Sequence, residues 1–249
     1  MKKNYKDLTF TNNFMFCKIL ENNPDLCKEL TETILDVKIR EIVKLDQQHF
    51  IKSTPDGHGV RFDVYFEDDE NTVYDIEMQT SDTRELRKRT RYYQSMIDRK
   101  ILDQGKHYTN LKKSYIIFIC TFDLFEEGLP KYTFRNTCDE DRNIELGDDA
   151  IKVFVNATSE SDNMSPEMKD FIKYLASGDA EGPLSQKIDS NLERARRNPE
   201  WEDSYMTFEE WVEDERAEAI EQTRAHDAKV LAEKLKFSFD EAMSMLTEE

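Results

Sequence analysis

The sequence is short of the residues and apolar runs that mark several classes of protein. Seven Gly and six Pro in 249 residues are few for the turns of an all-β sandwich, so long helices are expected. No window approaches the roughly 18 apolar residues that span a bilayer, and the N-terminal MKKNYKDLTFTNNF has no apolar run behind its lysines. Neither a membrane partner nor a secretory signal is therefore expected. The four cysteines show no CxxC spacing, which favours free thiols and a cytoplasmic location over disulfides or a zinc cluster.

Charge is distributed unevenly along the chain. The net charge of −18 is awkward for a nucleic-acid-binding protein, because affinity for phosphates comes largely from Lys and Arg. Residues 201–249, however, contribute −10 of it, whereas residues 84–113 carry ten Lys or Arg against three acidic residues. One basic stripe on an acidic body fits a confined nucleic-acid groove. It fits a solvated helix face equally well, so charge alone leaves both interpretations open.

Hydrophobic periodicity gives the order of the elements. Pro24 divides the first 37 residues into two helices, and Thr207 and Glu210 form a capping box that predicts the start of a long helix ending near Leu235. The other predicted elements are a strand at 39–52, a turn at 55–59, strands at 60–66 and 72–80, a helix at 82–104, strands at 114–122 and 151–157, and a linker at 177–183. The order predicts an α/β domain over residues 1–160, with a mixed sheet flanked by helices, and a helical C-terminal region over residues 161–249.

The clearest local pattern is a hairpin of two alternating strands. VRFDVYF and TVYDIEMQT each alternate apolar and polar residues, with a charged turn between them. The alternation places Phe62 on the apolar face with Val64, and Glu77 on the polar face with Gln79. If the loop consists of residues 69–71, Asp63 lies opposite Glu77, with β-carbons about 4.5–5.5 Å apart. Two carboxylates so close repel unless a cation such as Mg²⁺ neutralises them; the alternative is an acidic face that looks into water.

The spacing D-x(13)-E-x-Q, formed by Asp63, Glu77 and Gln79, resembles the active-site strands of the PD-(D/E)XK nuclease superfamily. Within it, the chain is most similar to the transposase, or recombination-promoting nuclease, family, in which Gln replaces the usual Lys. Four further stretches resemble that family in the same order: LTFTNNFMFCKIL, RTRYYQSMI, GKHYTNLKKSYIIFI and FDLF. The resemblance covers roughly residues 8–157 and implies a restriction-endonuclease-like core. Relatives usually have Asp where this chain has Asn13, and no role is assigned to that position.

The resemblance implies a metal-dependent DNA endonuclease of low sequence specificity, linked to recombination or mobile elements. Asp63 and Glu77 would hold Mg²⁺ or Mn²⁺, and the ion would polarise a phosphate oxygen and activate a bound water. Gln79 takes the catalytic position of the usual Lys but cannot accept a proton near neutral pH, so it would position the water. The implied partners are DNA and, by analogy with related nucleases, a second subunit in a homodimer. The predicted DNA contacts follow the Glu77 strand: Arg87, Lys88, Arg89 and Arg91.

Several alternatives remain open at this point. Gln79 and the acidic tail also fit a catalytically weak or inactive module that binds nucleic acid or assembles with other proteins. Arg89 could contact the scissile phosphate or pair with an acidic residue on the protein surface. Glu21 on the first helix could approach the metal, although a surface position is more common for such a residue. The acidic tail could mimic DNA or contact a partner, but a run of acidic residues most often forms a solvated helix face.

Overall fold

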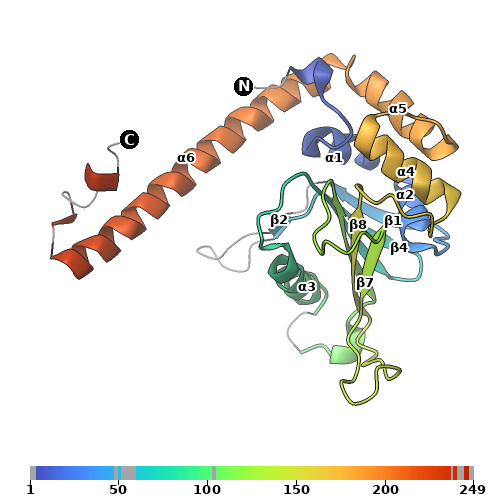
Figure 1. Ribbon diagram of the computed structural model, residues 1–249, viewed down its shortest axis with the longest axis horizontal. Helices are drawn as coiled ribbons and strands as arrows, with labels where there is room; N and C mark the ends of the chain where they lie inside the picture. The colour runs from blue at the N-terminus through green and yellow to red at the C-terminus, as the bar shows by residue number, and fades with distance from the viewer. Residues whose placement is uncertain are drawn as a thin grey trace. The chain divides into compact units, whose positions relative to one another are not determined.

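The computed structural model describes residues 4–47, 50–51, 60–102, 105–236, 238–239 and 244–246. Contacts divide the chain into two compact units, residues 1–197 and 198–249. The first unit contains a six-stranded sheet flanked by helices (Figure 1), as the sequence predicts. Among the described residues of both units, no helix combines the length and apolarity needed to cross a membrane.

The six-stranded sheet has the order β1-β4-β5-β6-β8-β7. β5 and β8 run parallel to β6, and every other pair in the sheet is antiparallel. β2 pairs with β3 in a separate two-stranded sheet. The strands are β1 (Ile42–Gln47), β2 (Phe50–Ile51), β3 (Val60–Arg61), β4 (Val64–Asp68), β5 (Val73–Gln79), β6 (Ser114–Cys120), β7 (Lys131–Phe134) and β8 (Ala150–Asn156).

Helices cover both faces of this sheet. α1 and α2 contact β1, and α4 and α5 pack on α1 and α2, while α3 contacts β6. Figure 1 shows α3 apart from the group formed by the other four helices. The segments are η1 (Tyr5–Asp7), α1 (Asn13–Glu21), α2 (Pro24–Leu35), α3 (Leu86–Ile101), η2 (Tyr108–Asn110), α4 (Pro166–Ser177) and α5 (Pro183–Ala195). α4 and α5, expected in the helical C-terminal region, thus belong by their contacts to the first unit.

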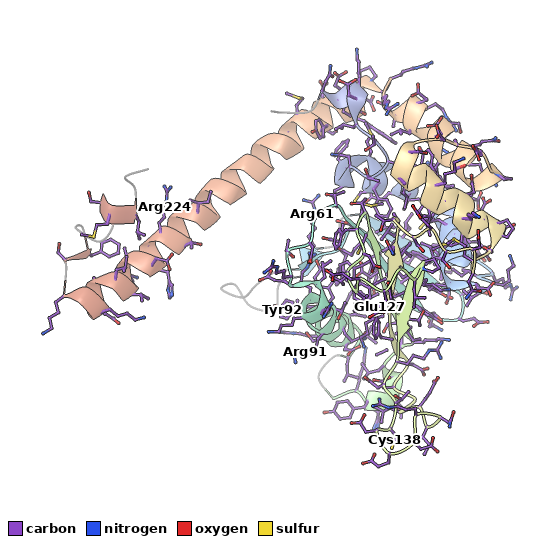
Figure 2. All side chains as sticks on the ribbon, viewed as in Figure 1. Arg61, Arg91, Tyr92, Glu127, Cys138 and Arg224 are labelled. Atoms are coloured by element: carbon purple, nitrogen blue, oxygen red, sulfur yellow. The ribbon has the colours of Figure 1, made fainter. Side chains whose placement is uncertain are left out.

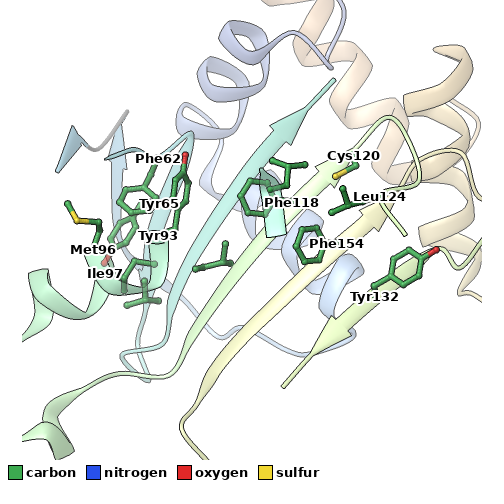
Figure 3. Close-up of a cluster of buried hydrophobic side chains, with 13 residues drawn as sticks. Phe62, Tyr65, Tyr93, Met96, Ile97, Phe118, Cys120, Leu124, Tyr132 and Phe154 are labelled. Atoms are coloured by element: carbon green, nitrogen blue, oxygen red, sulfur yellow. The ribbon is translucent and has the colours of Figure 1, made fainter. Parts of the chain in front are cut away.

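The apolar core under α3 has two parts. Phe62 and Tyr65 pack with Tyr93 of α3, and Phe118 stacks on Phe154 across β6 and β8, with ring centroids 5.7 Å apart. Figure 3 shows both groups as parts of one buried cluster. Tyr93 also packs against Phe118, with ring centroids 6.0 Å apart, and this contact joins the two groups.

Two of the predicted strands are interrupted. The expected strand at 39–52 is divided between β1 and β2, which belong to different sheets; residues 48–49 and the expected turn at 55–59 lie outside the described residues. The strand expected at 60–66 breaks between β3 and β4, because the Asp63 N–H donates to the Glu77 carboxylate, 2.9 Å away, instead of to a strand carbonyl. The break moves Phe62 to the α3 face, where its ring lies 5.2 Å from that of Tyr93. Its predicted place on the Val64 face is therefore wrong.

The second unit contains the long helix α6 (Pro199–Leu235). It ends where the sequence predicts, but it begins eight residues before Thr207. The Asn198 side chain accepts from the backbone N–H groups of Glu200 and Trp201, and Pro199 takes the first helical position. Thr207 lies inside the helix and donates to the Asp203 carbonyl. The capping box predicted at Thr207 and Glu210 is therefore wrong, since the Asn198 cap lies upstream of it.

Candidate active site

The hairpin formed by β4 and β5 has the predicted register. Val64 pairs with Ile76, and Glu67 pairs with Val73. The Asp68 N–H donates to the Thr72 carbonyl, 3.1 Å away, which closes a three-residue loop over residues 69–71. Asn71 in this loop has a φ of 63°, a left-handed conformation that Asn tolerates better than most residues. Extending the register by one pair places Asp63 opposite Glu77, as predicted.

Asp63 and Glu77 hold each other in place through the backbone. The Glu77 carboxylate accepts from the Asp63 N–H at 2.9 Å, and the Asp63 carboxylate accepts from the Met78 N–H at 3.1 Å. Asp63 is 7% exposed and Glu77 is 2% exposed. The acidic face is thus buried under α3, and the alternative of a hairpin face that looks into water is wrong.

Asp75 is a third carboxylate on this face. It precedes Glu77 by two residues on β5, and it is fully buried. Neither of its carboxyl oxygens accepts a hydrogen bond from an N–H or O–H group in the described part of the chain. Sequence reasoning assigned no role to Asp75. The signal for it was its place in the alternation with Glu77 and Gln79, since all three share one face of the strand.

The pKa values of the three carboxyl groups are raised. Burial, which disfavours the charged form, is the main cause for Asp63, Asp75 and Glu77 alike. The negative charge of Asp63 raises the pKa values of Asp75 and Glu77 further, and Arg89 opposes the shift at all three groups. The cluster therefore carries an excess of buried negative charge whenever its carboxyl groups are ionised.

Arg89 of α3 is a cation inside the site. Its guanidinium lies 3.5 Å from the Glu77 carboxylate, donates to the Tyr93 hydroxyl at 2.7 Å and donates to the Gln79 side-chain oxygen at 3.4 Å. The same group lies over the rings of Tyr93 and Phe118, 5.2 and 5.6 Å from their centroids. The sequence left two alternatives for Arg89: contact with the scissile phosphate, or pairing with an acidic residue on the protein surface. In the structure Arg89 pairs with an acidic residue, but that residue is the buried Glu77. The Arg89 side chain stays 30% exposed, so its outer edge is accessible.

The other predicted residues border this centre. Gln79 is half-buried at the end of β5, and its backbone carbonyl accepts from the Thr121 N–H. Arg87 donates to the Leu124 carbonyl and lies over the Phe125 ring, so it attaches α3 to the segment after β6. Lys88 and Arg91 are exposed on α3, and Figure 2 labels Arg91 beside the exposed Tyr92. The structure thus brings Asp63, Glu77, Gln79 and Arg89 together. It places Lys88 and Arg91 on the surface of α3, the helix that carries Arg89.

Helix α1 contributes residues that sequence reasoning left aside. Asn12 caps the helix by accepting from the Met15 N–H, whereas the Asn13 side chain forms a hydrogen bond with Asp63 that lowers the pKa of that carboxyl. Glu21 is only 6% exposed, so the surface position expected for it is wrong. Burial raises the pKa of the Cys17 thiol well above its usual range, and the charges of Asp63 and Glu21 raise it further, so Cys17 is an inert thiol beneath the carboxylates.

The donor set fits a hard divalent cation. Asp63 and Glu77 supply carboxylate oxygens facing each other, and Mg²⁺ is typically bound through one or two carboxylates together with waters and substrate phosphates. No group of three His, Cys, Asp or Glu side chains in the described residues has the arrangement of a metal cage. A two-carboxylate site, completed by oxygen ligands from outside this set, is therefore the arrangement that these residues support. The buried Asp75 adds a negative charge with no hydrogen-bond donor among the described residues to offset it.

Comparison with known proteins agrees with this geometry. A family model described as "PD-(D/E)XK nuclease family transposase" matches residues 7–245, which extends well beyond the stretch over which the motifs resemble that family. No curated protein and no solved structure matches the chain significantly. The mixed sheet flanked by helices is the architecture that the resemblance implied. The chain therefore belongs to the PD-(D/E)XK nuclease family transposases.

Proposed function

We propose that the protein is a divalent-cation-dependent endonuclease that hydrolyses phosphodiester bonds in DNA with low sequence specificity. The observation that carries the proposal is the buried pair Asp63 and Glu77, which face each other across the hairpin and are each fixed by a backbone N–H. Membership of a nuclease family supports this chemistry and makes DNA the expected partner. The family's description as transposases supports a role in recombination or in mobile elements.

Asp63 and Glu77 are the proposed ligands of Mg²⁺ or Mn²⁺. When bound, such an ion stabilises negative charge on a phosphate oxygen and lowers the pKa of a coordinated water. The two backbone hydrogen bonds keep both carboxylates at their places on the sheet before the ion arrives. This pre-organisation reduces the entropy that would otherwise be lost on binding.

Gln79 and Arg89 are the proposed positioning groups. Gln79 carries no titratable proton, so it acts by orientation and not as a base. Arg89 donates to the Gln79 oxygen, which leaves the amide NH₂ group of Gln79 free to turn toward a substrate oxygen. The exposed edge of Arg89 and the side chains of Lys88 and Arg91 then offer contacts to DNA phosphates along α3.

A module that binds DNA without cleaving it is the second candidate function. One observation favours it: the group at the position of the usual Lys is an amide held by Arg89. Such a module would bind DNA fully in the absence of metal. The two functions are separated by whether any bond is broken.

Plasmid nicking by the full chain in Mg²⁺, Mn²⁺ or EDTA tests the proposal. We expect cation-dependent nicking that Asp63→Asn and Glu77→Gln each reduce at least about 100-fold, because the loss of either carboxylate removes a ligand. Glu67→Gln is the matched control: Glu67 lies on β4 and pairs with Lys112 at 2.6 Å, away from the centre, and its substitution should leave nicking unchanged. DNA binding that needs no metal, together with no nicking by any of these proteins, would establish the binding module instead.

A further inference from the structure

In its ionised form, Asp75 is buried at a cost that no hydrogen-bond donor of the described residues offsets. It is fully buried in the middle of β5, and its carboxyl oxygens receive no hydrogen bond from the N–H and O–H groups of the described residues. Asp68 on the same hairpin is also buried, but it accepts from the N–H groups of Glu70 and Thr72 and from the Tyr74 hydroxyl. A buried carboxylate that receives no hydrogen bond is strongly destabilising. The contrast with Asp68 therefore indicates that Asp75 has a role other than stabilising the fold.

The surroundings of Asp75 show where its charge acts. In the sheet it lies between Tyr65 of β4 and Ile116 of β6, and neither of these neighbours offers it a charge of opposite sign. Its carboxyl lies within hydrogen-bonding reach of the Glu77 carboxyl and close enough to Asp63 to feel its charge. When both groups are ionised they repel each other, and either a shared proton, which their raised pKa values favour, or a bound cation removes that repulsion.

Arg89 offsets only part of this charge. Its guanidinium approaches Glu77 at 3.5 Å and is also engaged by Gln79 and Tyr93. Arg61 also lowers the pKa of Asp63, so two guanidinium groups face three buried carboxylates. The pull of Arg89 on Asp75 acts across a distance and not through a hydrogen bond. A divalent cation at Asp63 and Glu77 would supply the positive charge that the three carboxylates otherwise lack.

We propose that Asp75 is a positioning residue of the cation site, which acts through Glu77 and raises the affinity of Asp63 and Glu77 for a divalent cation. It is not a third direct ligand, since no three such side chains in the described residues are arranged as a metal cage. Its negative charge attracts the cation, and its contact with Glu77 limits the directions in which that carboxylate can turn. The inference rests on the proposed function, because it requires that the cation binds at Asp63 and Glu77.

Calorimetric titration of the full chain with Mn²⁺, without DNA, tests the proposal. We expect Asp75→Asn to weaken Mn²⁺ binding about tenfold or more, while the thermal midpoint of the metal-free protein stays equal to or above that of the wild type. A residue that served only the fold would show the reverse: a lower midpoint and an unchanged Kd. The rise in midpoint on adding saturating Mn²⁺ should also be smaller in Asp75→Asn, because stabilisation by a ligand follows its affinity.

Asp68→Asn is the matched control, because it removes the charge of a buried Asp from the same hairpin. Asp68 is satisfied by three donors, so its substitution should lower the midpoint and leave the Mn²⁺ Kd unchanged. An unchanged Kd in Asp75→Asn, or a loss of affinity equal to that in Asp68→Asn, would overturn the inference.

Glu77→Gln distinguishes this failure from failure of the proposed function. If Glu77→Gln abolishes Mn²⁺ binding and Asp75→Asn leaves it intact, the cation site stands and the role of Asp75 is wrong. If the wild type binds no Mn²⁺, or Glu77→Gln binds it as well as the wild type does, both the proposed site and the inference are wrong.

Discussion

At the scale of single residues, the properties of the site follow from the burial of Asp63, Asp75 and Glu77 on one face of the hairpin. The register that brings Asp63 opposite Glu77 follows from alternation and loop length alone, and the structure confirms it. The burial of the same face depends on where α3 lies, which no local pattern determines. For this reason the sequence could not decide whether the acidic face met water, which partner Arg89 would take, or that Asp75 lacks hydrogen-bond donors among the described residues.

The raised pKa values of Asp63, Asp75 and Glu77 predict a pH dependence of stability. The folded state of the metal-free protein holds protons on these groups more tightly than the unfolded state, where the pKa values are about 4. Stability from this source is fully present below about pH 4 and falls as pH rises through the raised values. In EDTA, we therefore expect the free energy of unfolding to decrease from pH 4.5 toward pH 8.

Urea unfolding at several pH values in EDTA measures this dependence. Glu77→Gln should flatten the decrease, because one of the three titrating groups is gone. Saturating Mg²⁺ should oppose the decrease in the wild type, since the cation binds the ionised form. A stability curve of Glu77→Gln parallel to that of the wild type across this range would contradict the account.

At the scale of elements, strands with continuous or alternating apolar patterns were predictable, and breaks within them were not. β5, β6 and β8 lie within a residue or two of their predicted bounds. The interruption between β3 and β4 arises because a backbone N–H donates to the Glu77 side chain, a long-range contact without a local signature. β7 was missed because Lys131–Phe134 is a short edge strand with two of its four residues exposed, too short for a periodic signal.

The exposed basic face of α3 is expected to contribute affinity for DNA without sequence preference. Replacing Lys88 and Arg91 together by Ala removes two surface charges that hold no part of the sheet in place. We expect the double variant to bind DNA about tenfold more weakly at low salt and to show a shallower dependence of log Kd on log salt, by about one to two units. Fluorescence anisotropy with a labelled duplex over a series of salt concentrations measures both quantities.

A second double variant controls for the loss of charge. Lys187 and Arg194 lie on α5, in the helical layer packed on α1 and α2 rather than on the α3 face. Their joint replacement by Ala removes the same charge from a different surface. Equal weakening of DNA binding by the two double variants would show that α3 is not the contact surface and that only net charge matters.

At the scale of the whole molecule, one family model matches both units, but negative charge is concentrated in the second unit. The family model extends over both, through residue 245, yet residues 201–249 contribute −10 of the net charge of −18. α6 has 37 residues, so the acidic residues of its sequence are spread along about 55 Å of helix. Like-charged surface repels DNA through the solvent at low ionic strength, and salt screens the effect beyond a Debye length of about 10 Å at 0.1 M.

Removal of the second unit tests whether this charge limits DNA binding. A chain that ends at Arg197 keeps the contacts that close the first unit, including the Tyr5 hydroxyl on the Ala195 carbonyl and the Arg196 side chain on the Leu8 carbonyl. We expect this chain to fold, to bind Mn²⁺ with the affinity of the full chain, and to bind DNA several-fold more tightly at 50 mM salt. The gain should disappear near 300 mM salt, because screening removes long-range repulsion but leaves short-range contacts. A gain that persists at high salt would indicate that the tail occludes the DNA surface directly, and a loss of DNA affinity would make the tail part of that surface.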